Sequence, residues 1–127
     1  MKLLPKALRA SLPPLYSTES VPTEEKIIRV KFFTPDSSWT WYAVEGSPVN
    51  AAGEALTGPC APSDADVTTQ AADFLFFGLV DGLEREWGYF SLRELTTLRG
   101  LMGLPVERDL HFGTPTVGEL LSKEARA

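Results

Sequence analysis

Polar and apolar residues alternate at the period of a β-strand in one part of the first third of this chain. The alternation is clearest over residues 26–34, and an aromatic and β-branched run follows at 39–45. Between the two lie Pro35 and Asp36, residues that favour a tight turn. The pattern therefore predicts two antiparallel strands joined as a hairpin.

A second pair of strands is predicted further along the chain. Residues 74–83 are apolar on both sides of a strand, which is typical of a central strand covered by a helix on at least one face. We expect the following turn at residues 84–87, with Asp81-Gly82 as the rival position. Residues 88–90 then form a short fourth strand.

Three segments carry helical signals. Leucines four residues apart after a first-turn proline predict a helix over 5–12. Ser91 and Glu94 form a capping box, which predicts a helix over 91–99. A last helix is expected to open at 114–115, where Thr and Pro precede a new apolar stripe.

The order of these elements favours an α+β fold. Residues 107–112 complete the set as a fifth strand at a sheet edge, so we expect a mostly antiparallel sheet of about five strands with two to three packed helices. The length fits one domain over 1–127. Residues 47–72 are rich in Gly, Pro, Ala and Thr and read as a loop-like excursion, within which Ser63 could cap a short helix over 63–71.

The net charge of −5 is distributed unevenly. Residues 32–84 contain eight Asp and Glu residues and no Lys or Arg, which disfavours binding to a phosphate backbone. Such a segment indicates a solvated acidic face or a surface that meets a basic partner. The lone Cys60 cannot form an internal disulfide, and no signal-peptide core or membrane-length apolar run is present, so we expect a cytoplasmic protein without membrane contact.

Signatures of catalysis, metals and cofactors are missing from the sequence. His111 is the one histidine and Cys60 the one cysteine, so no His/Cys ligand spacing exists and any nucleophilic triad would depend on His111. Neither a Walker loop nor a dinucleotide fingerprint occurs. We expect no cofactor, no metal and no catalytic residue, and an enzyme is the less favoured class.

Aromatic and charged residues near the predicted turns remain as binding candidates. Trp39 and Trp41 share one side of their strand, and whichever of Trp87 and Tyr89 the core leaves uncovered would add to an exposed patch. Carboxylates supply a charged rim beside it. The complete set of predicted binding residues is Trp39, Trp41, Tyr89, Asp36, Asp81, Glu84, Glu86 and Arg108.

Several short motifs resemble an uncharacterised family of small proteins carried on bacterial plasmids, conjugative elements and phages. They are KALRASLPPLY (6–16), VKFFTPD (30–36), WTWY (39–42), FFG (76–78), GYFS (88–91) and LPVERD (104–109). The likeness leaves out residues 47–72, a segment that is longer here than the family pattern. The resemblance implies a bacterial cytoplasm and mobile-element biology, and it transfers no catalytic residue.

The leading hypothesis is a non-enzymatic accessory protein of a mobile element that binds a macromolecule, with a protein favoured over nucleic acid, and with anti-restriction or anti-CRISPR action as a special case. One rival is an enzyme or small-ligand binder with a pocket between the sheet and the 91–99 helix, using Arg108 with Glu107 or Asp109. A second rival is nucleic-acid binding through the basic residues of the N-terminal segment, Lys26, Arg29 and Lys31. The sequence leaves the oligomeric state open.

Overall fold

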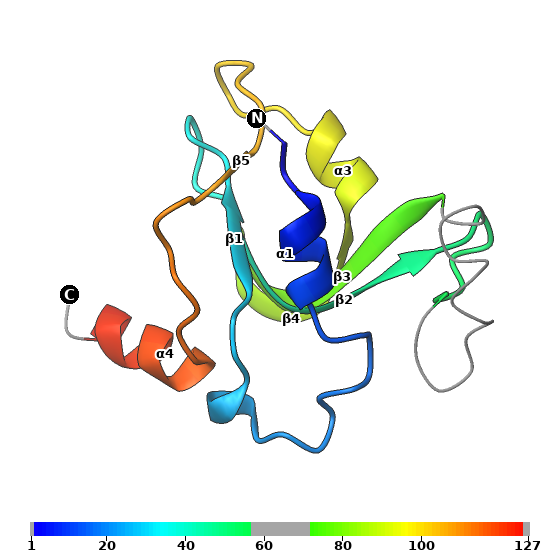
Figure 1. Cartoon of the computed structure of the whole chain (residues 1–127). Helices are drawn as coiled ribbons and strands as arrows, with labels where there is room; N and C mark the ends of the chain where they lie inside the picture. Colours follow the sequence, from blue (N-terminus) through cyan, green and yellow to red (C-terminus); the bar gives the residue numbers. More distant parts are fainter. Residues whose placement is uncertain (1, 57–71, 126–127) are drawn as a thin grey trace.

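The computed structural model describes residues 2–56 and 72–125, and the statements below concern these residues. It contains one antiparallel sheet of five strands in the order β4-β3-β2-β1-β5 (Figure 1). The strands are β1 (Val30–Phe33), β2 (Thr40–Val49), β3 (Asp73–Asp81), β4 (Arg85–Ser91) and β5 (Glu107–Arg108). The helices are α1 (Lys6–Ser11), the short 3-10 helix η1 (Thr23–Glu25), α3 (Leu92–Thr97) and α4 (Val117–Ala125). The predicted α+β fold is thus confirmed.

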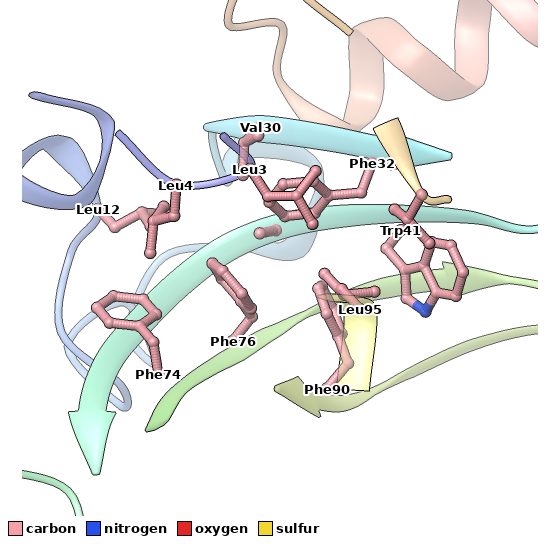
Figure 2. Packing of buried hydrophobic residues seen from close by; sticks show 12 residues of the cluster. Leu3, Leu4, Leu12, Val30, Phe32, Trp41, Phe74, Phe76, Phe90 and Leu95 are labelled. Carbon is pink, nitrogen blue, oxygen red and sulfur yellow. The ribbon is translucent and has the colours of Figure 1, made fainter. Parts of the chain in front are cut away.

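One side of the sheet, the closed face, carries the larger hydrophobic core, to which α1, α3 and the N-terminal leucines contribute. Phe76 lies at its centre, with no exposed surface and ring centroids 5.1–5.4 Å from those of Phe32, Phe74 and Phe90. Figure 2 shows Leu4, Leu12 and Phe74 at one end of this core and Trp41 at the other. The cluster comprises Leu3, Leu4, Leu12, Val30, Phe32, Trp41, Ala43, Phe74, Phe76, Phe90, Leu95 and Val106.

The opposite side of the sheet, the α4 face, is covered by one helix. There α4 packs Val117 and Leu120 against apolar residues of β2 and β3. Two backbone hydrogen bonds fix the start of the helix beside β1: Ile28 N–H donates to the Pro115 carbonyl at 2.8 Å, and Val117 N–H to the Lys26 carbonyl at 2.9 Å. Figure 1 shows α4 beside β1, well away from α1 and α3.

The start of α3 follows from its capping residues, as predicted. The Ser91 hydroxyl accepts a hydrogen bond from the Glu94 N–H at 3.1 Å, which satisfies one of the free donors of the first turn. The Asp73 carboxylate accepts a second from the Arg93 N–H at 3.0 Å. The helix ends at Thr97, short of the predicted Arg99.

The turn between β3 and β4 lies at residues 82–84, so the predicted position at 84–87 is wrong and the rival Asp81-Gly82 position is correct. Asp81 pairs with Arg85 in the sheet register. The physical reason lies at Gly82, where an added Cβ would come within 2.2 Å of the Trp39 indole. The turn therefore needs a glycine under Trp39, and β4 begins at Arg85 instead of at Gly88.

The fifth strand is at the sheet edge, as predicted, but is much shorter. It pairs with β1 only at residues 107 and 108. The chain then turns away, because the Asp109 carboxylate accepts a hydrogen bond from the His111 N–H at 2.9 Å and closes a local turn.

The excursion between β2 and β3 begins later than predicted. Residues 47–49 belong to β2, which is paired with β3 as far as Val49 and Asp73. Ser47 is buried here, and its hydroxyl accepts a hydrogen bond from the Leu15 N–H at 2.9 Å. The helix expected over 63–71 and the residue Cys60 lie outside the described residues.

Candidate functional site

The structure places the two predicted tryptophans on the closed face. Trp41 is buried in the core, whereas Trp39 precedes β2 and keeps 38% of its surface exposed. The two rings stack with centroids 6.0 Å apart. Trp39 also covers Gly82, so its main contacts are with the fold itself.

Tyr89 lies on the other side of the sheet from Trp41. The register pairs Tyr89 with Phe77 and Trp87 with Leu79, and Leu79 belongs to the core of the α4 face. Side chains alternate between faces along a strand, so these two aromatic residues share the α4 face. The sheet therefore separates Tyr89 from the tryptophan pair, and the three predicted aromatics do not form one patch.

The predicted polar residues have separate tasks in the fold. The Asp36 carboxylate accepts hydrogen bonds from the backbone N–H groups of Met102 and Leu104, at 2.6 and 3.1 Å, and holds that distant loop. Arg108 is half-buried in β5, where it pairs with Phe32 of β1. Three more predicted residues, Asp81, Glu84 and Glu86, lie at or next to the β3–β4 turn. Asp81 is ion-paired with Arg85, whereas Glu84 and Glu86 are exposed.

A continuous group of aromatic rings lies on the α4 face along β3 and β4. The Phe77 ring is stacked on Trp87 at 5.7 Å and tilted against Tyr89 at 5.1 Å, and Tyr89 lies 6.5 Å from Tyr16. Trp87, Tyr16 and Tyr89 expose 37%, 49% and 52% of their surfaces. We call Tyr16, Phe77, Trp87 and Tyr89 the aromatic surface.

Tyr16 joins this surface because a buried carboxylate holds its loop. Glu45 is 3% exposed and accepts hydrogen bonds from the Tyr16 N–H at 2.8 Å and the Thr18 N–H at 2.9 Å, and also from the Thr18 hydroxyl. Tyr16 has a φ of 70°, in the left-handed region that non-glycine residues rarely adopt. The carboxylate therefore fixes a strained residue in place at the edge of an exposed aromatic group.

The surroundings of the aromatic surface are electrically negative. Partial burial raises the pKa of Tyr89, and a hydrogen bond with Tyr16 and the negative charges of Glu45 and Glu19 raise it further. The neighbouring Arg85 adds little positive charge, because its guanidinium is bound to two carboxylates. The aromatic surface therefore disfavours anions and favours cations.

A second feature of the α4 face is a cavity of about 570 Å³ between α4, the chain that follows β5, and the β1–β2 strands, here called the α4 pocket. Its lining includes Lys31, whose ammonium group lies 3.8 Å from the Asp109 carboxylate. That ammonium group also lies 5.9 Å from the centroid of the Tyr42 ring and 5.7 Å from that of Phe112. The sequence did not predict this pocket, because the residues that line it come from β1, β2 and the C-terminal segment, which are far apart along the chain.

A cavity also lies beside α3, where one of the rival hypotheses expected a pocket. It has a volume of about 340 Å³ and is lined by residues of α1, the start of β3 and α3, including Arg9, Asp73 and Arg93. Arg108 does not line it, and neither do Glu107 or Asp109. The charged groups predicted for that pocket are therefore elsewhere.

Two negative findings apply to the described ranges 2–56 and 72–125. Within them, no three His, Cys, Asp or Glu side chains are grouped so that they could hold a metal ion. In the same part of the chain, each helix is too short or too polar to cross a membrane.

The fold defines a small α+β protein built on one antiparallel sheet. Its sequence matches the family model "Protein of unknown function (DUF2958)" over residues 62–126, which is half of the chain, and the protein belongs to this family. No curated protein and no solved structure matches it. The family match contains β3, β4, α3, β5 and α4, and hence three of the four rings of the aromatic surface, but it does not reach Tyr16.

Proposed function

We propose that this protein is a non-enzymatic accessory protein that acts by binding a macromolecular partner, and that the partner docks on the aromatic surface. The observation that supports the proposal is the contiguous group of rings, three of them at least one-third exposed, on a face that α4 leaves uncovered. Grouped exposed aromatics are typical of protein interaction sites, where Trp and Tyr contribute much of the binding energy.

The partner we propose is a protein with a basic segment. Glu19 and Glu45 make the field at Tyr89 negative, and Glu84 and Glu86 are exposed in the adjoining hairpin. Arg and Lys side chains bind the faces of Trp and Tyr rings through cation–π attraction, which neighbouring carboxylates reinforce. In addition, β4 is an edge strand of seven residues, which offers unpaired backbone groups to a partner chain.

Nucleic acid is a less suitable partner for two reasons. The negative surroundings repel phosphate groups. Two of the three basic residues predicted for this role are already engaged: the Lys26 ammonium donates to the Thr18 carbonyl, and that of Lys31 lies near the Asp109 carboxylate.

The resemblance to small proteins of plasmids, conjugative elements and phages supports the biological setting in this proposal. We place the protein in the bacterial cytoplasm, as an accessory of a mobile element. Anti-restriction or anti-CRISPR action is the special case in which the bound partner belongs to a host defence system.

The test is affinity capture from the host cell with three baits: the full chain, a Trp87→Ser/Tyr89→Ser double variant and a Trp39→Ser control. Trp39 is a matched control because it is 38% exposed, against 37% for Trp87, but lies on the closed face. We expect a protein whose yield falls at least about ten-fold with the double variant and is unchanged with the control. Chemical crosslinks should map to a Lys- and Arg-rich segment of that protein.

Two outcomes contradict the proposal. One is an equal yield of every captured protein from the wild-type chain and the double variant, with melting temperatures that show both to be folded. The other is capture that nuclease treatment abolishes, which would support nucleic-acid binding instead.

A further inference from the structure

The sheet has two outer edges, and they are protected to different extents. At one end of the sheet, β5 pairs with β1 at only two residues before the chain turns away at Asp109. The chain just before β1 is closed off as well, because the Ile28 N–H is bonded to the Pro115 carbonyl ahead of α4. At the other end, β4 runs for seven residues, and no strand of the described ranges lies beyond it. β4 is therefore the long, open edge of the sheet.

β4 lacks the features that usually keep an edge strand from pairing with another chain, which are prolines, lysines, bulges or a covering segment. It contains no proline and no lysine, and its register with β3 is unbroken over 85–91. Its charged residues, Arg85 and Glu86, are confined to one end. Within residues 2–56 and 72–125, no backbone group of residues 85–90 is hydrogen-bonded to a segment outside the β3–β4 hairpin. The edge is thus suited to accept a further strand.

Gly88, in the middle of β4, is a glycine that the fold itself does not require. An added Cβ there would have no atom within 4 Å, its φ is not in the left-handed region, and the register passes through it without a bulge. Its register partner Gly78 differs, because a Cβ at Gly78 would lie 1.9 Å from the Tyr42 carbonyl oxygen. A glycine in a regular strand often marks the close approach of another backbone. No described residue makes that approach at Gly88, so the space is left for a partner chain.

The groups along this edge define the chemistry of the segment that fits it. Residues 81–91 contain three carboxylates and one arginine, and that arginine, Arg85, is bound to Asp81 and Glu124. On the α4 face, the rings of Trp87 and Tyr89 project from β4 two residues apart. Basic side chains at the same spacing can lie over these rings and near the carboxylates.

We propose that the partner binds β4 as a sixth strand, through an extended segment in which every second residue is Arg or Lys. This inference rests on the proposed function and adds to it the conformation and the residue pattern of the bound segment. The backbone of the segment is hydrogen-bonded to the open edge of β4. Its basic side chains lie over Trp87 and Tyr89, and the side chains between them lie on the side of Gly88.

The test uses the full chain and a synthetic heptapeptide of alternating threonine and arginine, with two analogues that are N-methylated at the arginines or at the threonines. Alternate residues of a strand direct their N–H groups to opposite edges, so one analogue loses the hydrogen bonds to β4 and the other keeps them. Titration calorimetry should show dissociation constants that differ at least about ten-fold between the two analogues, because several backbone hydrogen bonds are lost together. A heptapeptide of alternating threonine and glutamate is the matched acidic control and should not bind.

Hydrogen exchange of the ¹⁵N-labelled chain supplies a second measurement. The arginine peptide should slow the exchange of alternate amides within residues 85–90, which are the amides that point away from β3. A Trp87→Ser/Tyr89→Ser double variant should bind the peptide at least about ten-fold more weakly. The Trp39→Ser control should bind it like the wild type.

Three results would overturn strand addition. The first is an equal affinity of the two methylated analogues, which would mean that side chains alone dock on the aromatic surface. The second is a failure of the unmethylated arginine peptide to bind, and the third is binding of the glutamate peptide with equal affinity. The capture experiment described above does not depend on the conformation of the bound segment, so the proposed function is tested separately.

Discussion

The same strands build both faces of the sheet, but the two faces are covered to different extents. On the closed face, Phe32 and Phe76 have no exposed surface (Figure 2). On the α4 face, one helix covers the region near β1 and β2, and Trp87 and Tyr89 remain open to solvent. The aromatic surface and the α4 pocket both lie on this incompletely covered side.

The difference shows that one side of β3 is fully buried and the other only partly covered. This strand directs Phe74 and Phe76 into the closed core, and Phe77 and Leu79 to the α4 face. A strand with apolar residues on both sides typically has both sides covered. Here the cover on one side is partial, which leaves apolar area for a partner.

The strongest test of the comparison is a pair of alanine substitutions at neighbouring residues of β3. Phe76→Ala should lower the free energy of unfolding by about 3–5 kcal/mol, because it removes a fully buried ring with three aromatic neighbours. Phe77→Ala removes a half-buried ring and should cost about 1 kcal/mol. Urea denaturation of both variants measures the two values, and equal losses would show that the faces are packed alike.

The next effect in size concerns the carboxylate that holds the Tyr16 loop to the sheet. Glu45→Ala should lower the free energy of unfolding by about 1.5–3 kcal/mol, since it leaves two backbone N–H groups without their charged acceptor. Glu19→Ala, at an exposed position, should change it by no more than about 0.5 kcal/mol. If thermal unfolding shows the two variants to be alike, the loop does not depend on Glu45.

A smaller effect is expected where the hairpin is tied to α4. Arg85 bridges Asp81 at 2.7 Å and Glu124 at 2.5 Å, with all three side chains about one-third exposed. Solvent screens such pairs, so Arg85→Gln should cost about 0.5–1 kcal/mol in unfolding free energy. The difference from the wild type should shrink between 0.05 and about 1 M salt, where the Debye length falls to about 3 Å. A loss that does not depend on salt would argue for packing instead of ion pairing.

The smallest expected effect on stability at neutral pH comes from the titration of the Tyr42 hydroxyl. Burial and the nearby Glu124 raise its pKa in the folded state above the ordinary value of 10.0. Its contribution to stability is therefore complete below pH 10 and is lost as the pH rises through the folded-state pKa. Tyr42→Phe removes this sensitivity, so the stability of the variant relative to the wild type should rise above pH 10. Urea denaturation of both proteins at pH 8 and pH 11 measures this change. An equal difference in unfolding free energy between variant and wild type at the two pH values would contradict the prediction.

Local sequence signals predicted the elements better than their arrangement. The Ser91 cap, the hairpin around residues 35–38 and the central, doubly apolar third strand all follow from neighbouring residues, and the structure contains each. The β3–β4 turn was misplaced because the requirement for Gly82 comes from Trp39, far away along the chain. Local patterns carry no information about such a contact.

The site was harder to predict than the fold for a related reason. Whether Trp41 and Tyr89 share a face depends on the register across β2, β3 and β4, and β2 has an irregularity between Ala43 and Glu45 that pattern counting does not detect. Tyr16 lies in a loop and reaches the sheet only through Glu45. Trp87 and Tyr89 could be singled out as aromatic residues at and beside the predicted turn, but their neighbours could not.

The chain leaves the sheet at the end of β2 and re-enters it at the start of β3, at two residues that face each other. Val49 and Asp73 are register partners, and the Ala72 N–H donates to the Val49 carbonyl at 2.8 Å. The sheet therefore holds the two ends of the connection together. The two ends are thus anchored by the pairing of β2 with β3, and this pairing should persist in a variant that carries an affinity tag between residues 56 and 72.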